Sequence, residues 1–409
     1  MTDTDTDAVA PGPLTGVTVL DLTNVLAGPY AAYQLALMGA DVIKVETPHG
    51  GDLARRLGTS AELNARHLGI SFLAQNAQKR SITLDLKTEG GAQALRRLVA
   101  TADVLVENFR PGVLERLGFG WEQLHTLNTR LILCQISGFG QTGPMRTKPA
   151  YDQIIQGYSG MMSVTGTQAT GPLRAGFPLA DTIGGLAAAF AVSSALAGRA
   201  TTGVGSVIDV SMLETAVTAM GWVVSNLLVD GHEPLPLGND NGTAAPSGAF
   251  ATGDGLLNIA ANKQEQFETL CALVDRADLI VDPRFAEREN RKAHRAALTI
   301  ELEHALAARA ATEWEDLLSS AGVPAAAVLR VDQMLASPQI RDRGLVHELP
   351  FPGGGGDPLR VLGNGIRIDG RISAPRTPPP TLGEHTDEIL ATLGYSADDI
   401  AALYEEGAV

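Results

Sequence analysis

The chain of 409 residues contains few cysteines and carries no excess of positive charge. Its two cysteines, Cys134 and Cys271, fit a reducing compartment and offer neither a disulfide framework nor metal-ligand spacing. The formal net charge of −15 argues against a sequence-independent nucleic-acid binder, because such proteins need basic surfaces to replace the counterions of phosphates. We therefore expect no metal site and no nucleic-acid partner, and an anionic ligand must meet a local basic patch.

Long apolar segments are also absent from the sequence. Nowhere do about 18 apolar residues run uninterrupted, so we expect no membrane-spanning helix and no membrane partner. Residues 1–13 are acidic and polar, which predicts a disordered tail and neither a signal peptide nor an anchor. Together with the cysteine usage, these features favour a cytoplasmic protein.

Short β-branched runs alternate with helical segments through the first half of the chain. The expected strands are residues 17–22, 41–46, 81–86, 103–107 and 131–136, with helices such as 27–38 and 89–100 between them. Such alternation predicts βαβ units on a mainly parallel sheet, hence a large Rossmann-like α/β domain. Longer helices are expected at 181–196 and 211–229, with a strand at 205–210 between them.

The character of the sequence changes at the Gly-, Pro- and Asn-rich stretch 231–248, which is typical of a linker or loop. Strands at 248–251 and 256–260, followed by helices near 263–273, 290–308 and 312–321, predict a smaller α+β domain. The expected divisions are a large domain beginning at 14–200, a linker helix and loop at 201–247, a small domain at 248–330, and a return linker with the rest of the large domain at 331–409.

A dinucleotide site on such a sheet requires Gly-x-Gly-x-x-Gly directly after the first strand. The chain has Thr23-Asn-Val-Leu-Ala-Gly28-Pro29 there, so we expect no nicotinamide or flavin cofactor. Side chains could bind phosphates instead. The candidates are Lys79 and Arg80 near the third expected strand, and Arg110 and Arg116 after the fourth. Most Lys and Arg side chains are simply solvated, so these positions carry weight only in combination.

One carboxylate introduces a long, almost uncharged helix. Asp181 precedes Gly184, Gly185 and a run rich in Leu and Ala, where the free N–H groups of a helix N-terminus favour an ionised side chain. An ionised carboxylate there can act as a nucleophile, and the two glycines permit close approach of another backbone or of a thioester. The alternative is that Asp181 is only an N-cap, as Asp commonly is.

Five sequence blocks, in order, resemble the class III CoA-transferases, the CaiB/BaiF family: residues 16–22, 37–46, 79–86, 102–112 and 382–387. The resemblance implies that Asp181 is catalytic, with Tyr151 and Asp152 near the thioester. It also implies an interlocked homodimer, with the active site between the large domain of one subunit and the small domain of the other. The CoA-contacting positions that it implies are Leu26, Ala27, Asn76, Lys79, Arg80, Asn108, Phe109, Arg110 and Arg116.

The implied function is transfer of CoA from an acyl-CoA to a small carboxylate, with acyl-CoA as a substrate and no resident cofactor. A carboxylate nucleophile would conserve the thioester energy as an aspartyl anhydride and then as aspartyl-CoA. Backbone N–H groups at Gly184, or in the loop from Gly238 to Gly242, are candidate oxyanion donors.

Two alternatives to this function stay open. Relatives that racemise 2-methylacyl-CoA have His-Asp where this chain has Tyr151-Asp152, and a glutamate base where residues 260–263 are Ala-Ala-Asn-Lys. A racemase is therefore disfavoured, and a non-catalytic CoA-binding protein would require Asp181 to be dispensable. Formyl-CoA transferases have a glycine run where this chain has Gly238-Asn-Asp-Asn-Gly242, which argues against formyl or oxalyl substrates. Small dicarboxylates such as succinate are favoured by the cations Lys148 and Arg174.

Overall fold

The computed structural model describes residues 12–409, so most of the tail predicted at 1–13 lies outside the described residues. The chain divides into two compact units. The first comprises Met1–Met161, Arg174–Gly231 and Arg341–Val409, and the second comprises Met162–Leu173 and His232–Ile340. Residues 201–231, predicted as part of a linker, thus belong to the first unit.

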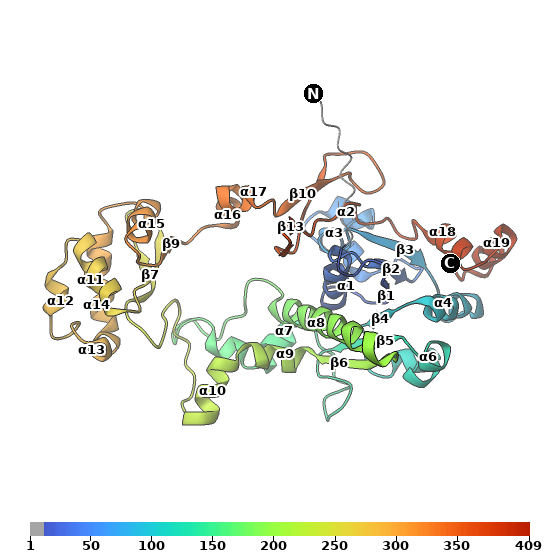
Figure 1. Ribbon diagram of the computed structural model, residues 1–409, viewed down its shortest axis with the longest axis horizontal. Coiled ribbons are helices and arrows are strands. Elements are labelled where there is room, and N and C mark those ends of the chain that lie inside the picture. Colours follow the sequence, from blue (N-terminus) through green and yellow to red (C-terminus); the bar gives the residue numbers. More distant parts are fainter. Residues whose placement is uncertain (1–11) are drawn as a thin grey trace. The chain divides into compact units, whose positions relative to one another are not determined.

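A six-stranded parallel sheet forms the centre of the first unit (Figure 1). Its strands, in the order β3-β2-β1-β4-β5-β6, are β1 (Thr18–Asp21), β2 (Asp41–Glu46), β3 (Lys79–Thr83), β4 (Val104–Glu107), β5 (Ile132–Ser137) and β6 (Val207–Ser211). The order reverses between β1 and β4. Open α/β sheets bind ligands outside the carboxyl ends of their strands at such a switch point. The predicted parallel α/β domain is confirmed.

Helices cover both faces of this sheet, which explains why its inner strands are apolar on both sides. One core lies under α1 (Ala27–Leu37), α7 (Asp152–Tyr158), α8 (Leu179–Thr202) and α9 (Met212–Ala219). The opposite core lies under α4 (Glu89–Thr101), α6 (Trp121–Leu127), α18 (Thr386–Thr392) and α19 (Ala397–Glu406). The C-terminal segment therefore returns to complete the large domain.

Two helices of the first unit differ from their predicted bounds. The helix expected at 211–229 is two helices, α9 and α10 (Gly221–Asp230), which meet at a 75° bend. Gly221 stands at the break, as is usual for sharp helix kinks. Helix α8 begins at Leu179, two residues earlier than predicted.

Helix α8 is long and apolar enough to cross a membrane by length and composition, and the bent pair α9–α10 would pass the same test if taken as one span. Core helices of soluble proteins share these properties. The expected lack of a membrane partner therefore stays a prediction.

The second unit contains an antiparallel sheet in the order β7-β8-β9, with β7 at Ser247–Ala251, β8 at Leu256–Ala260 and β9 at Ala325–Ala327. Its helices are α11 (Gln264–Leu273), α12 (Asp278–Val281), α13 (Arg288–Ala293), α14 (Arg295–Leu306) and α15 (Ala311–Ser320). Phe250, Phe267, Phe285 and Trp314 are buried in its core. The predicted small α+β domain is thus present, although the helix expected at 290–308 is interrupted at His294.

Short elements complete the chain. They are η1 (Leu53–Arg56), α2 (Ala61–Ala65), α3 (Ile70–Leu73), α5 (Val113–Arg116), η2 (Met161–Val164), α16 (Val331–Ala336), α17 (Pro338–Asp342), β10 (Val346–Leu349), β11 (Leu359–Leu362), β12 (Arg367–Ile368) and β13 (Arg371–Ile372).

Candidate active site

Asp181 lies in the first turn of α8, whose N-cap position is occupied by Pro178. The cap comes from another helix. Oδ1 of Asp152, the first residue of α7, accepts hydrogen bonds from the N–H of Ala180 at 2.8 Å and of Asp181 at 3.3 Å. Asp181 therefore does not cap its own helix, and the interpretation of this residue as merely an N-cap is wrong.

The environment of Asp181 favours its protonated form. Burial, and then the neighbouring charge of Asp152, raises the pKa of Asp181 to about 7. This corrects the expectation that the helix N-terminus keeps the carboxylate ionised, because burial and the charge of Asp152 act in the opposite direction. Carboxyl groups with pKa values shifted by burial and a like charge concentrate at functional sites.

Gln156 fixes the segment that leads into α8, and sequence reasoning missed it. Its Nε2 donates to Oδ2 of Asp152 at 2.7 Å and to the carbonyl of Phe177 at 3.2 Å, while its Oε1 accepts from the N–H of Ala175 at 2.9 Å. The residue is fully buried. The i,i+4 spacing of Asp152 and Gln156 placed both on one helix face, which is the signal that could have identified the pair.

Three residues near Asp152 and α7 face solvent in the first unit. Arg174 lies half-exposed with its guanidinium 3.9 Å from Oδ2 of Asp152. Among residues 12–409 we find no second carboxylate paired with it, so most of its N–H donors remain open to a ligand. Tyr151, at the N-cap of α7, is 67% exposed, which shows that it is not core packing. Lys148 is exposed on the preceding loop.

The N-terminus of α1 packs against the first turns of α8. Gly185 is buried there, and a Cβ at this position would lie 2.5 Å from the carbonyl oxygen of Ala27. Glycine is thus required by close approach of a second helix. Leu26 and Ala27, two of the predicted CoA contacts, therefore begin a helix whose first turn contacts α8 about one turn beyond Asp181.

Loops from both sides of the switch point meet beside a cavity at the carboxyl ends of the strands. The Asn108 side chain accepts from the N–H of Asn24 and donates to its carbonyl, each at 2.8 Å. The cavity has a volume of about 320 Å³, and Phe109 lines it. Arg110 and Arg116 follow Phe109 in the sequence and are exposed. The ionisable side chains that line the cavity itself are Glu46, His49, Asp52, Asp85 and Lys87.

Three of the remaining predicted CoA contacts are engaged within the protein. Lys79 is buried as the first residue of β3, and its Nζ donates to Asp21 Oδ2 at 2.8 Å, Pro29 O at 2.9 Å and Asn76 Oδ1 at 2.8 Å. Burial lowers the pKa of Lys79 to about 8 despite the charge of Asp21. Arg80 pairs with Asp41 at 2.6 Å and Glu388 at 3.2 Å.

The side chains of Asn76, Lys79 and Arg80 thus bond to protein groups, and their contact with CoA stays a prediction. Asn76 Nδ2 also donates to the carbonyl of Phe72, at 2.9 Å. The Lys79 charge is neutralised inside the protein and is not presented to solvent. Of the four cations predicted to bind phosphates, Arg110 and Arg116 are exposed.

Two of the glycines predicted to stabilise the oxyanion use their own N–H groups within the protein. Gly184 is the sixth residue of α8, where an N–H bonds the carbonyl four residues earlier and is not available to a ligand. Gly238 belongs to the second unit, and its N–H donates to the carbonyl of Gly166 at 2.6 Å. Gly242 lies in the same unit, next to Leu237.

Metal ligands do not gather in the described part of the chain: no group of three or more His, Cys, Asp or Glu side chains there could hold a metal ion. The Rossmann strand order, the switch point and a partly buried aspartate beside a like charge define an α/β enzyme of the open parallel-sheet type. Comparison with known proteins makes this class specific. The model of CoA-transferase family III matches residues 14–386, and the chain belongs to that family.

Relatives of known name agree with this assignment. A succinate–glutarate CoA-transferase of Agrobacterium fabrum is 37% identical over 93% of this chain and 96% of that protein. The human succinyl-CoA:glutarate CoA-transferase is 34% identical over 97% of this chain and 90% of that protein. An acetyl-CoA:oxalate CoA-transferase of Acetobacter aceti is 38% identical over 90% of this chain and 92% of that protein. This relative is named for oxalate, so it does not support the argument from the loop at residues 238–242 against oxalyl substrates.

Solved structures show the same fold. A CaiB/BaiF family protein from Brucella suis superposes with a TM-score of 0.82 at 36% identity, covering 94% of this chain and all of that one. The resemblance drawn from five sequence blocks is therefore confirmed. The chain is a CoA-transferase and transfers CoA between carboxylic acids.

Proposed function

We propose that Asp181 is the nucleophile of this transfer. The observation that carries the proposal is its place at the start of α8, held through its backbone by Asp152 while burial and that same charge raise its pKa to about 7. A carboxylate that is poorly solvated is more reactive toward a thioester carbonyl than one in water. The alternative of α-proton exchange lacks comparable support, because Tyr151 stands where the racemases have a histidine.

The reaction conserves the thioester energy in two covalent steps. A carboxylate oxygen of Asp181 attacks the donor acyl carbonyl, the C–S bond breaks, and CoA leaves as a thiolate from a mixed anhydride. The thiolate then attacks the Asp181 carbonyl carbon of that anhydride, the C–O bond to the donor breaks, and the donor leaves as a free carboxylate. The acceptor carboxylate attacks the resulting aspartyl-CoA, and the same steps in reverse produce the new acyl-CoA.

CoA binds at the carboxyl edge of the large sheet in this proposal. Leu26 and Ala27 approach α8 there, and Asn108 and Phe109 lie beside the cavity of about 320 Å³. Arg110 and Arg116 supply the positive charge that the phosphates require, since guanidinium groups bind phosphate well. No resident metal, nicotinamide or flavin takes part in the proposed reaction.

Small dicarboxylates are the proposed acyl donors and acceptors. Several relatives are named for succinate, glutarate and mesaconate. In this chain the half-exposed guanidinium of Arg174 lies 3.9 Å from the carboxylate of Asp152, and that carboxylate also accepts from the N–H of Asp181. A guanidinium matches a carboxylate in planar, bidentate geometry, so Arg174 is suited to hold the distal carboxylate of the substrate.

We also propose that the working enzyme is a homodimer in the cytoplasm. Large apolar side chains stand exposed on α8 and α10 of the first unit: Phe190 is 76% exposed, Trp222 61%, Leu228 78% and Val229 86%. Clusters of exposed apolar side chains commonly mark protein interfaces. A second copy of the chain is the partner that family membership favours.

Mass spectrometry with hydroxylamine trapping tests the proposal. The protein is incubated with succinyl-CoA, glutaryl-CoA or acetyl-CoA, then treated with hydroxylamine and digested. A hydroxamate on Asp181 that disappears in Asp181→Asn is expected. Loss of the α-proton to deuterated water without any adduct would overturn the transferase mechanism in favour of the racemase. An adduct at another carboxylate would overturn the assignment of Asp181.

A further inference from the structure

Val25 has an unusual backbone conformation directly before the predicted CoA contacts. Its φ is +68°, in the left-handed region, which β-branched residues rarely occupy. Such a conformation persists only where surrounding contacts fix it, and it occurs most often at functional sites. The residue lies in the loop that joins β1 to α1, immediately before Leu26 and Ala27.

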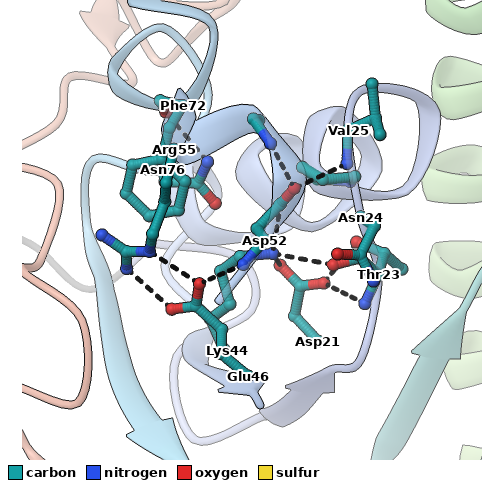
Figure 2. A network of polar contacts seen from close by, with 12 residues as sticks. Asp21, Thr23, Asn24, Val25, Lys44, Glu46, Asp52, Arg55, Phe72 and Asn76 are labelled. Carbon is teal, nitrogen blue, oxygen red and sulfur yellow. Dashed lines mark hydrogen bonds and ion pairs between the residues drawn. The ribbon is translucent and has the colours of Figure 1, made fainter. Parts of the chain in front are cut away.

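Two buried, oppositely charged side chains hold this loop from one side (Figure 2). Oδ1 of Asp52 accepts from the N–H of Val25 at 2.9 Å and from that of Ala54 at 2.8 Å. Oδ2 of Asp52 lies 3.0 Å from Nζ of Lys44, which in turn donates to the carbonyl of Thr23 at 2.9 Å. Both side chains are fully buried. The pair therefore binds the backbone on either side of Asn24.

The clamp is anchored at both ends. Glu46 Oε1 accepts from the N–H of Asp52 at 3.0 Å, and Arg55, stacked on Phe72, donates to both oxygens of Glu46 at 2.7 Å (Figure 2). From the opposite side, Asn108 bonds both the N–H and the carbonyl of Asn24. Three consecutive loop residues are thus held by side chains from β2, from the turn after it and from the loop after β4.

The clamped loop determines where the first turn of α1 lies against the nucleophile's helix. Ala27 follows Val25 by two residues, and its carbonyl leaves no room for a Cβ on Gly185 of α8. A change in the Val25 backbone would therefore move the first turn of α1 relative to α8. Asp52 contributes to the wall of the cavity, but its carboxylate is buried. That carboxylate accepts from the N–H groups of Val25 and Ala54 and pairs with Lys44.

We propose that Asp52, paired with Lys44, is a positioning residue for CoA transfer: it holds Val25 in the left-handed conformation that places Leu26 and Ala27 beside α8. The inference rests on the proposed function of Asp181 and adds a residue that does not touch the reacting atoms. Replacing both Lys44 and Asp52 removes their ion pair without leaving Asp21 unpaired, because Asp21 still pairs with Lys79 at 2.8 Å.

A matched pair of double variants separates the loss of the ion pair from the loss of the oxygen that accepts from Val25 and Ala54. Lys44→Met with Asp52→Asn removes both charges but keeps an oxygen for the Val25 N–H. Lys44→Met with Asp52→Leu removes that acceptor as well. We expect kcat to be at least ~30-fold lower in the leucine variant than in the asparagine variant. The leucine variant should also melt at a lower temperature, because the N–H groups of Val25 and Ala54 lose their acceptor. Adding Val25→Asn to the leucine variant should restore kcat at least ~5-fold, because Asn tolerates positive φ.

Two further measurements separate this inference from general destabilisation and from the proposed function. Arg199→Met breaks a partly buried 2.7 Å ion pair with Asp103 elsewhere in the first unit and should lower the melting temperature while leaving kcat within ~2-fold. Hydrogen exchange of the peptide covering residues 22–31, together with CoA affinity, reports the loop without catalysis. If the wild type shows no Asp181 adduct, the proposed function fails, whereas equal exchange and equal kcat in the two double variants overturn the clamp.

Discussion

Asp152 stabilises the backbone of Asp181 and opposes the charge of its side chain. Its Oδ1 accepts the Asp181 N–H at 3.3 Å, and its negative charge is the second cause, after burial, of the raised pKa of Asp181. Gln156 keeps Asp152 in this position by donating to Oδ2 at 2.7 Å. In the proposed mechanism Asp181 loses its negative charge when it forms an acyl bond. An environment that disfavours the anion therefore favours that step.

The rate of acyl-enzyme formation should depend on pH through this interaction. In the proposed mechanism the ionised form of Asp181 attacks. Because its pKa is about 7, the single-turnover rate should rise with pH through a midpoint near 7 and then level off. Asp152→Asn keeps an acceptor for the Ala180 N–H but removes the opposing charge, so the midpoint should fall by up to about one pH unit. Rapid-quench measurement of the Asp181 adduct from pH 5 to 9 provides the check. A midpoint that rises or stays constant in Asp152→Asn would contradict the role of Asp152.

Replacement of Asp181 should stabilise the protein at alkaline pH. The folded pKa of about 7 lies above the ordinary value of 3.8, so the folded state binds the proton more tightly and loses stability as pH rises through this window. Asp181→Asn removes that loss. We expect a gain on the order of a few kcal/mol in the free energy of unfolding at pH 8, with a smaller gain at pH 5.

Denaturant unfolding at the two pH values tests this expectation, with loss of the hydroxylamine adduct confirming the variant. Asp398→Asn, a change in the first turn of α19, is a control for general surface charge and should show no such pH-dependent gain. An equal gain at both pH values would mean that the pKa of Asp181 is not raised.

The alternation of strands and helices predicted the parallel sheet, because a period of two and a period near 3.6 are local properties of the chain. The strand order and the switch point depend on which strands pair, and pairs such as β1 with β4 join residues far apart in sequence. Asp181 was identified from local pattern and resemblance. Its cap was not, because Asp152 reaches it across 29 positions.

Lys79 shows why the charged positions were harder to predict. Next to Arg80 it has the pattern of a solvated basic pair, but the strand begins at Lys79 and buries it. The burial is tolerable because Asp21, 58 positions earlier, lies 2.8 Å away. Burial alone would raise the pKa of Asp21, but Lys44 and Lys79 outweigh it and lower that pKa to about 2. The pairing of these buried charges depends on tertiary contacts between distant residues, so the local sequence does not reveal it.

Arg174 should determine preference for dicarboxylates. Arg174→Gln removes the guanidinium that we place on the distal carboxylate, so kcat/KM for succinyl-CoA with glutarate should fall by about 10- to 100-fold, the usual range for a lost charge-assisted hydrogen bond. Transfer between acetyl-CoA and propionate should change much less, because neither acid has a second carboxylate. Arg360→Gln, which removes an exposed cation from β11, is the matched control. An equal fall in kcat/KM for both substrate pairs would mean that Arg174 acts only through its contact with Asp152 and does not bind the substrate.

Gly185 and Gly198 lie on the same helix and should respond oppositely to alanine. A Cβ on Gly185 would stand 2.5 Å from the Ala27 carbonyl, which is backbone and cannot move aside without shifting α1. Gly185→Ala should therefore cost about 1–3 kcal/mol of stability and also lower kcat, since the first turn of α1 moves away from Asp181. Gly198 is exposed with open space around its Cα, so Gly198→Ala should gain about 0.5–1 kcal/mol through helix propensity without changing kcat. Chemical denaturation and steady-state kinetics on the two variants decide the point. A tolerated Gly185→Ala with full activity would show that the contact between α1 and α8 does not position the site.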